Sequence, residues 1–214
     1  MVDAKNASGK KLMVGLNNRY TELSLFLKQY IADGRLGKIY TARCGWRRRR
    51  GIPGKGGWFT TRALSGGGPL IDLGVHFFDL TLFFMGFPAP TSVLAATYDP
   101  FITRTDLVTA MPEGTDNAGV KGGICDVEDL ATGFVRFENG ATVSFEFSWA
   151  SNIERDTTYF ELLGTRGGIK FEDGIVQLYS EFEGRTLTAV PAVKNTSAWG
   201  ENETAHFLDC ILRN

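Results

Sequence analysis

Histidine and cysteine are scarce in this sequence of 214 residues, which contains two histidines and three cysteines. The cysteines Cys44, Cys125 and Cys210 show no Cys-x-x-Cys spacing, so neither a disulfide framework nor a zinc site is indicated. Two histidines are too few for a histidine-rich metal site. We therefore predict a functional site without metal.

An excess of one charge is also absent, because 23 basic residues face 24 acidic ones. This balance argues against a dedicated nucleic-acid binder. No apolar stretch is expected to reach the eighteen or so residues of a membrane span, and the polar start "MVDAKNASGKK" is unlike a signal peptide. We predict a cytoplasmic protein with neither a nucleic acid nor a membrane as its partner.

The known phosphate-binding glycine loops are missing as well. Gly66, Gly67, Gly68 and Pro69 have neither the G-x-G-x-x-G spacing of a dinucleotide loop nor the lysine of a P-loop. Pro69 suits the first position of a helix, and the chain then runs to Gly86 without an internal proline. The glycines are therefore predicted to precede a largely buried helix.

Asp72 and His76 stand four residues apart on this predicted helix, so they are expected to share one face. In one interpretation His76 fills a core position and Asp72 satisfies its ring N–H. In the other, Asp72 orients an imidazole that exchanges a proton with a substrate. Three glycines at the start of the helix would let a ligand approach the backbone, which favours the second interpretation.

The order of the predicted elements indicates an α+β protein with a large, mostly antiparallel open β-sheet and helices on one face. Asn139-Gly140 between two alternating runs is a strong hairpin signal. The predicted helices cover residues 1–10, 21–32, 69–86 and 201–213, and the predicted strands cover 11–16, 37–47, 127–149 (as a hairpin), 158–163, 169–171, 175–179 and 186–190.

The stretch "GGGPLIDLGVHFFDL" resembles the G-G-G-x-L-x-D-x-G-x-H-x-x-D motif of the Gfo/Idh/MocA family, the NAD(P)-dependent glucose-fructose oxidoreductases and inositol dehydrogenases. Other stretches are similar to this family in the same order: "KLMVGLNNRY", "LGKIYTARCGW", "LLGTRGGIKF" and "ENETAHFLDCI". The resemblance covers nearly the whole chain. It implies the dihydrodipicolinate-reductase-like fold of the family's C-terminal domain.

The family's nucleotide domain carries G-x-G-x-x-G and a Glu-Lys-Pro motif, and the sequence contains neither. The resemblance therefore implies a fragment. Residues 1–18 would be a remnant of the dinucleotide-binding Rossmann domain, and residues 19–214 the substrate-binding and oligomerisation domain, truncated in its last helix. NAD or NADP would bind the full-length enzyme, and the fragment alone is expected to be inactive.

Carried over by position, the resemblance implies that His76 is the catalytic histidine and Asp72 its partner, acting on a sugar or polyol. Gly66, Gly67, Gly68 and Arg19 would lie at the cofactor, while Asp79 is interpreted as a structural carboxylate paired with backbone or a nearby arginine.

The loop "GWRRRRGIPGKGGWF" allows two interpretations. It could be a solvated surface loop, because like charges in a row usually repel one another into water. It could also face the substrate, with Trp58 stacking on a sugar and one of the four arginines clamping an anionic group. We take Trp58, Arg49 and Lys55 as candidate substrate-binding residues.

Two alternatives to a dehydrogenase stay open. Relatives on this scaffold include redox-assisted lyases and glycosidases, and a non-enzymatic dimerisation module would also fit an open sheet. Alternating positions such as Phe134, Val143, Phe145 and Phe147 require that at least one face of the sheet is covered. The resemblance implies a homodimer, or a higher homo-oligomer, packed through that sheet.

Overall fold

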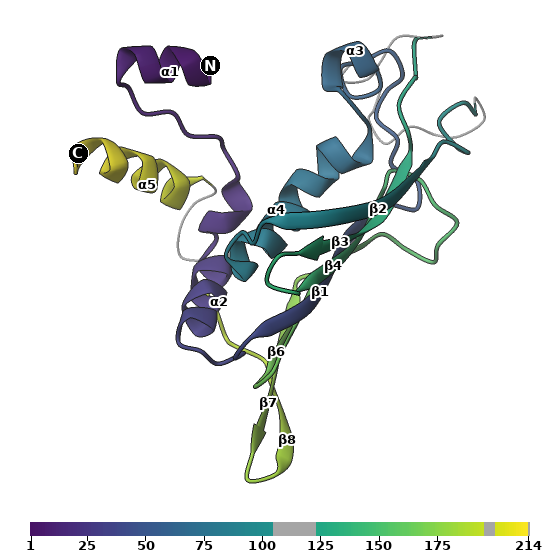
Figure 1. The fold of residues 1–214 in the computed structure, drawn as a ribbon. Helices are drawn as coiled ribbons and strands as arrows, with labels where there is room; N and C mark the ends of the chain where they lie inside the picture. Colours follow the sequence, from purple (N-terminus) through teal and green to yellow (C-terminus); the bar gives the residue numbers. More distant parts are fainter. Residues whose placement is uncertain (105–122, 195–199, 214) are drawn as a thin grey trace.

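A single eight-stranded sheet organises the chain (Figure 1). The computed structural model describes residues 1–104, 123–194 and 200–213. The strand order is β2-β3-β4-β1-β5-β6-β7-β8, and neighbours are antiparallel except for the parallel pair β1 and β4. The strands are β1 Ile39–Arg47, β2 Pro90–Tyr98, β3 Leu130–Phe137, β4 Thr142–Ser148, β5 Thr157–Gly164, β6 Gly168–Glu172, β7 Ile175–Phe182 and β8 Arg185–Ala189.

Helices cover one face of this sheet, which confirms the predicted α+β class. The main contact is made by α4, whose Phe78 and Phe84 rings lie 5.2 Å from Phe145 and 5.4 Å from Phe160. In Figure 1, α1 and α5 lie together in an arm apart from the sheet. The helices are α1 Val2–Ser8, the 3₁₀ helix η1 Asn17–Tyr20, α2 Glu22–Ala32, α3 Arg62–Ser65, the π-helical turn η2 Leu70–Gly74, α4 Val75–Met85 and α5 Glu201–Leu212.

The long helix predicted from Pro69 to Gly86 starts with the π-helical turn η2 before it becomes α-helical. Gly74 ends this turn close to the sheet, since a Cβ built on it would lie 3.5 Å from the Phe147 ring. Gly86 ends α4 in the left-handed conformation at φ 78°, as glycine commonly does after a helix. The ends of the helix were therefore predictable, whereas its wide first turn was not.

The expectation that no apolar stretch reaches membrane-spanning length was wrong. The helical run Arg62–Met85 has 24 residues and, by length and composition alone, is long and apolar enough to cross a membrane. Of its apolar 18-residue stretch, 44% is buried in the fold. Because α4 packs against the sheet, the run has the character of a core helix of a folded domain.

The strand predicted at residues 11–16 does not form. This segment lies between α1 and η1 without regular structure, and Val14 is 71% exposed. An isolated strand has unpaired backbone groups on both edges, so an apolar run becomes a strand only where a sheet edge is available.

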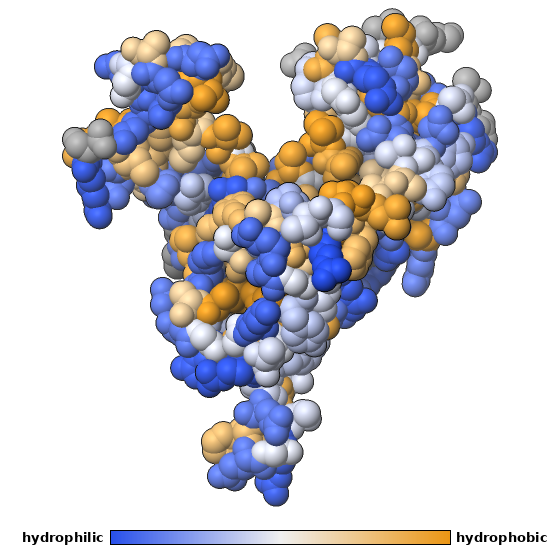
Figure 2. All heavy atoms as spheres, in the orientation of Figure 1, coloured by the Kyte–Doolittle hydropathy of each residue, from blue (hydrophilic) through white to orange (hydrophobic). Residues whose placement is uncertain are grey.

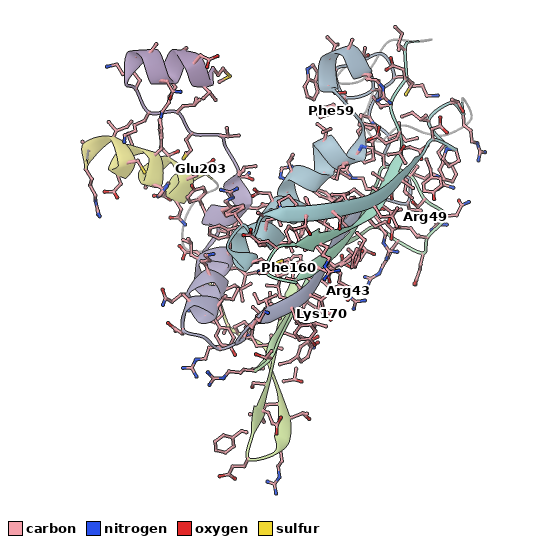
Figure 3. The ribbon with its side chains drawn as sticks, viewed as in Figure 1. Arg43, Arg49, Phe59, Phe160, Lys170 and Glu203 are labelled. Carbon is pink, nitrogen blue, oxygen red and sulfur yellow. The ribbon has the colours of Figure 1, made fainter. Side chains whose placement is uncertain are left out.

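The two faces of the sheet differ in polarity. Val143, Phe145 and Phe147 are buried on the face that α4 covers, so they do not form an open apolar face. The opposite face carries ion pairs between Arg43 and Glu161 and between Lys170 and Glu172. Figure 3 shows Arg43 and Lys170 close together on the sheet. Phe134, 46% exposed, alternates with Val135 and lies on this open face.

Candidate active site

His76 is the second residue of α4 and is only partly buried. Its ring lies 6.0 Å from the indole of Trp46, at an interplanar angle of 52°. Trp46 comes from β1 and also makes an edge contact with Phe77 at 5.9 Å. The imidazole is therefore held beside the sheet by an aromatic wall and remains accessible to a ligand.

Asp72 lies in η2, one turn before His76, and its carboxylate is fixed by the sheet. The indole Nε1 of Trp149 donates a hydrogen bond to Asp72 Oδ2 at 2.8 Å, and Trp149 is completely buried. A direct hydrogen bond between Asp72 and His76, as their spacing suggested, is not formed in the described part of the chain. Asp72 is thus oriented by Trp149, and its Oδ1 is left to accept another hydrogen bond.

The buried residue Asp129 supports the backbone of Trp149. The backbone N–H of Trp149 donates to the carbonyl oxygen of Asp129 at 2.9 Å. The side chain of Asp129 accepts hydrogen bonds from the backbone N–H groups of Phe101 and Ile102, at 2.6 and 2.7 Å. Burial raises the pKa of Asp129, although these two N–H groups oppose the shift. No motif or spacing in the sequence indicated this support.

The three glycines before the helix have different surroundings. A Cβ on Gly68 would lie 2.1 Å from the carbonyl oxygen of Glu128, and the Gly68 N–H donates to Glu128 Oε1 at 2.9 Å. A Cβ on Gly67 would be 3.0 Å from Ile71. Gly66 has φ 84° and open space where a side chain would be. Packing thus accounts for Gly68, while the open side of Gly66 could receive a ligand.

Arg19 connects η1 to α4. Its Nε donates to Asp79 Oδ2 at 2.7 Å and its Nη2 binds the other carboxylate oxygen, while the guanidinium lies 4.9 Å above the Phe87 ring. The hydrogen bond with Asp79 raises the pKa of Arg19. Asp79 is therefore paired with an arginine, as expected for a structural carboxylate. The contact brings η1 within one helical turn of His76.

The predicted substrate residues of the loop contact other partners in the structure. Trp58 is 49% exposed and packs edge-on against Phe59 at 5.4 Å. Lys55 Nζ donates to the carbonyl of Arg104 at 2.6 Å. Arg49, labelled at the edge of the molecule in Figure 3, donates from Nη1 to the carbonyl of Glu154 at 3.1 Å. None of these contacts involves Asp72 or His76.

Trp46 and Trp149 lie at the site, although the sequence did not single them out, and Arg48, one of the four arginines of the basic loop, lies there too. The guanidinium of Arg48 lies 4.8 Å from the centre of the Trp46 ring. The alternation of β1 could have revealed Trp46, because it shares the helix-facing side with the buried Cys44. The approach of Trp149 to Asp72 follows from the sheet order and has no local signal.

Two cavities of the described residues have linings that include neither Asp72 nor His76. One, of about 310 Å³, is lined by residues of α2, α4, β5 and β6, among them Leu27, Phe77 and Phe160. Another, of about 260 Å³, lies along Arg43, Tyr159 and Lys170. Neither of these two cavities is lined by Asp72, His76 or Trp58.

Comparisons with known proteins agree with this architecture. Residues 25–170 match the family model described as GFO/IDH/MocA C-terminal domain. The putative UDP-kanosamine synthase oxidoreductase subunit of Amycolatopsis mediterranei (strain S699) is 37% identical over 164 residues, which are 77% of this chain and 44% of that protein. The D-glucoside 3-dehydrogenase of Escherichia coli (strain K12) is 31% identical over 194 residues, which are 88% of this chain and 51% of that protein.

The fold is shared with a solved structure of levoglucosan dehydrogenase in complex with NADH and levoglucosan, with a TM-score of 0.78 and 22% identity over 99% of this chain and 59% of the other. The chain spans about half the length of the curated relatives it matches. These relatives are named as oxidoreductases or dehydrogenases, two of them with sugar substrates in their names. From its family model and its relatives, the chain belongs to the Gfo/Idh/MocA oxidoreductase family.

Proposed function

We propose that this chain is the substrate-binding and catalytic-histidine domain of an NAD(P)-dependent oxidoreductase that acts on a CH–OH group of a sugar. The observation that carries the proposal is the accessible imidazole of His76, which follows by one turn a carboxylate fixed through Trp149. The relatives named D-glucoside 3-dehydrogenase and levoglucosan dehydrogenase support a pyranoside as the substrate.

In this proposal one side chain transfers the proton, and other side chains bind and orient the sugar. His76 takes the proton from the hydroxyl oxygen of the reacting carbon, so that a C=O bond forms as the C–H bond breaks. Asp72, with Oδ2 occupied by Trp149, accepts a hydrogen bond from a neighbouring hydroxyl through Oδ1 and orients the sugar. The aromatic wall of Trp46 restricts the imidazole to one side of the substrate.

A nicotinamide cofactor, when bound, would accept the hydride from the same carbon. The residues present fit such a group at one point, because the open side of Gly66 leaves the backbone accessible next to the first turn that carries Asp72. Gly67 and Gly68 would border it through their backbone. Arg19, which is already paired with Asp79, would form the boundary of the cofactor site on the side of η1.

We assign residues 1–18, which include α1, to the dinucleotide-binding domain of the whole protein, and the rest of that domain would lie against the arm formed by α1 and α5. Neither helix has a buried residue, and Leu208, Ile211 and Leu212 of α5 are 53%, 47% and 82% exposed. Figure 2 shows hydrophobic surface in the notch between this arm and the end of the molecule that holds α3. A second domain would cover apolar area that is otherwise costly to expose.

An assay of hydride transfer tests the proposed function. We expect the whole protein, with its dinucleotide-binding domain, to reduce NAD⁺ or NADP⁺ in the presence of D-glucosides, followed by nicotinamide absorbance. The 214-residue chain alone should bind neither cofactor more tightly than about millimolar, roughly 4 kcal/mol, in calorimetric titration.

Two results would contradict this proposal. Tighter cofactor binding by the chain alone would mean that the cofactor site lies within these residues. A whole protein that transfers hydride from no sugar or polyol would mean that the chain serves another purpose.

A further inference from the structure

Arg48 is the arginine of the basic loop that lies beside the catalytic face. It follows β1 directly, two residues after Trp46, and its guanidinium stacks on the Trp46 indole at 4.8 Å. The His76 ring is another neighbour of the same indole, at 6.0 Å. The guanidinium of Arg48 and the imidazole of His76 therefore both lie beside the Trp46 side chain.

The backbone and stem of Arg48 are held in place. Its N–H donates to the carbonyl of Ser148 at 3.0 Å, and a Cβ on Gly51 would approach Arg48 Cδ to 2.5 Å. The side chain therefore folds back over a position where only glycine leaves room. This arrangement fixes the direction of the guanidinium at little entropic cost.

The hydrogen-bonding capacity of this guanidinium is largely unused. Arginine has five N–H donors, and the described residues give Arg48 one hydrogen bond, a 3.4 Å contact from Nη1 to the carbonyl of Gly51. Burial lowers the pKa of Arg48, and the charges of Asp72 and Asp156 partly oppose that shift. A partly buried cation with spare donors is costly unless a ligand completes its hydrogen bonds.

The neighbouring arginines differ in this respect. Arg49 binds the carbonyl of Glu154, and Arg50 binds the carbonyl of Ser151 and the side chain of Asn152. These two side chains stabilise the loop after β4. Arg48 is the member of the run whose donors remain beside Asp72 and Trp46.

We propose that Arg48 is a specificity-determining residue that donates hydrogen bonds to a sugar hydroxyl next to the carbon oxidised at His76. This inference rests on the proposed function. Arg48 supplies donors and Asp72 Oδ1 supplies an acceptor, a combination that recognises two adjacent hydroxyl groups of a pyranose. The apolar face of the sugar would then lie toward Trp46.

The test compares Arg48→Gln with the wild-type whole protein on a methyl D-glucoside and on its monodeoxy analogues. Removing a hydrogen bond to a charged group should lower kcat/KM for the parent glucoside by about 10- to 100-fold. For the analogue that lacks the contacted hydroxyl, the same substitution should change kcat/KM by less than about threefold, because that hydrogen bond is already missing. Arg48→Lys keeps the charge and should show the same pattern with a smaller loss.

Arg50→Gln is the matched control, since Arg50 also lies over an aromatic ring, Phe101 at 5.2 Å, and binds backbone carbonyls. Its kcat/KM ratios between glucosides should equal those of the wild type. An equal loss on the parent and on every analogue, in both Arg48 variants, would overturn the inference and leave the proposed function standing. A wild-type protein inactive on all sugars would instead refute the proposed function itself.

Discussion

At the scale of single residues, Asp72 and His76 share one helical face but have different surroundings. Asp72 is tied to the buried indole of Trp149, whereas His76 keeps part of its ring accessible beside Trp46. A histidine that served only the core would be enclosed by apolar side chains. The difference between the two side chains predicts different consequences of their removal.

We expect His76→Ala to lower kcat of the whole protein by about 10²- to 10⁴-fold, the usual contribution of a positioned general base. The melting temperature should change little, because the ring is not enclosed. His206→Ala provides the control, since this other histidine lies on α5 against Tyr20 and outside the site. A large fall in melting temperature with a small fall in kcat would show that His76 supports packing instead.

Asp129 predicts a dependence of stability on pH. Burial raises its folded pKa above the ordinary value of 3.8, so the folded protein holds this proton at pH values where the unfolded chain has lost it. The stabilisation from this group is fully present below 3.8 and is lost as the pH rises through the folded pKa. Urea unfolding of the wild type and of Asp129→Asn across this range should show the wild type losing free energy of unfolding relative to the variant. If the difference in free energy of unfolding between the wild type and Asp129→Asn did not change with pH, the prediction would be contradicted.

At the scale of elements, local signals predicted most boundaries correctly. Thr21 caps α2 by accepting a hydrogen bond from the Ser24 N–H, and Gly140 adopts φ 81° in the predicted hairpin turn between β3 and β4. The failures concern segments whose state depends on distant partners. Residues 11–16 have the apolar residues typical of a strand, but no strand of the sheet lies beside them to pair with. The π-helical turn at Leu70–Gly74 is set by packing against β4.

The glycine run offers a test that separates packing from cofactor approach. Gly68→Ala should destabilise the chain by about 1–3 kcal/mol, because its Cβ would overlap the backbone of Glu128. Gly67→Ala should cost less, since its new neighbour is a side-chain atom of Ile71, Cγ1 at 3.0 Å, and not backbone. Chemical denaturation without cofactor measures both variants. Equal stability of Gly68→Ala and wild type would mean that this glycine serves only the ligand.

At the scale of the whole molecule, the open face of the sheet is more polar than the alternation of the strands suggested. Its ion pairs lie on β1, β5 and β6, and a smaller apolar area lies toward the β2 edge of the sheet. This area includes Phe134 of β3 and Leu94 of β2, which is 79% exposed. A homodimer through this face remains our proposal. Its interface would combine that apolar area with the ion-paired residues of the same face.

We expect sedimentation to give a dimer at tens of micromolar and Phe134→Glu to shift it toward monomer. Phe182→Glu introduces the same charge at a phenylalanine that is 64% exposed on the other side of the sheet, and should leave the dimer intact. A wild-type monomer at these concentrations, or equal effects of both variants, would argue against this interface.

The candidate site was only partly predictable from the sequence, for a reason that concerns the whole molecule. The motif around Asp72 and His76 is local and could be identified from its residue types and their spacing. Trp149 reaches Asp72 across 77 positions of the chain, and Arg48 reaches the site because β1 ends beside α4. Such contacts depend on strand order, which the residues of the motif do not encode.

The central place of β1 has a consequence for how the chain acquires its structure. The strands β2 to β4 and β5 to β8 form two antiparallel sets, and in the sheet order β1 is the strand that joins them. Its Thr41 pairs with Thr142, which lies 101 positions later. At roughly 5–20 residues per second of synthesis, β1 would wait on the order of 5–20 s for β4 and somewhat longer for β5. We therefore expect insertion of β1 to be a late and slow step of folding, and substitutions in β1 that hinder it should reduce the yield of folded protein more than its final stability.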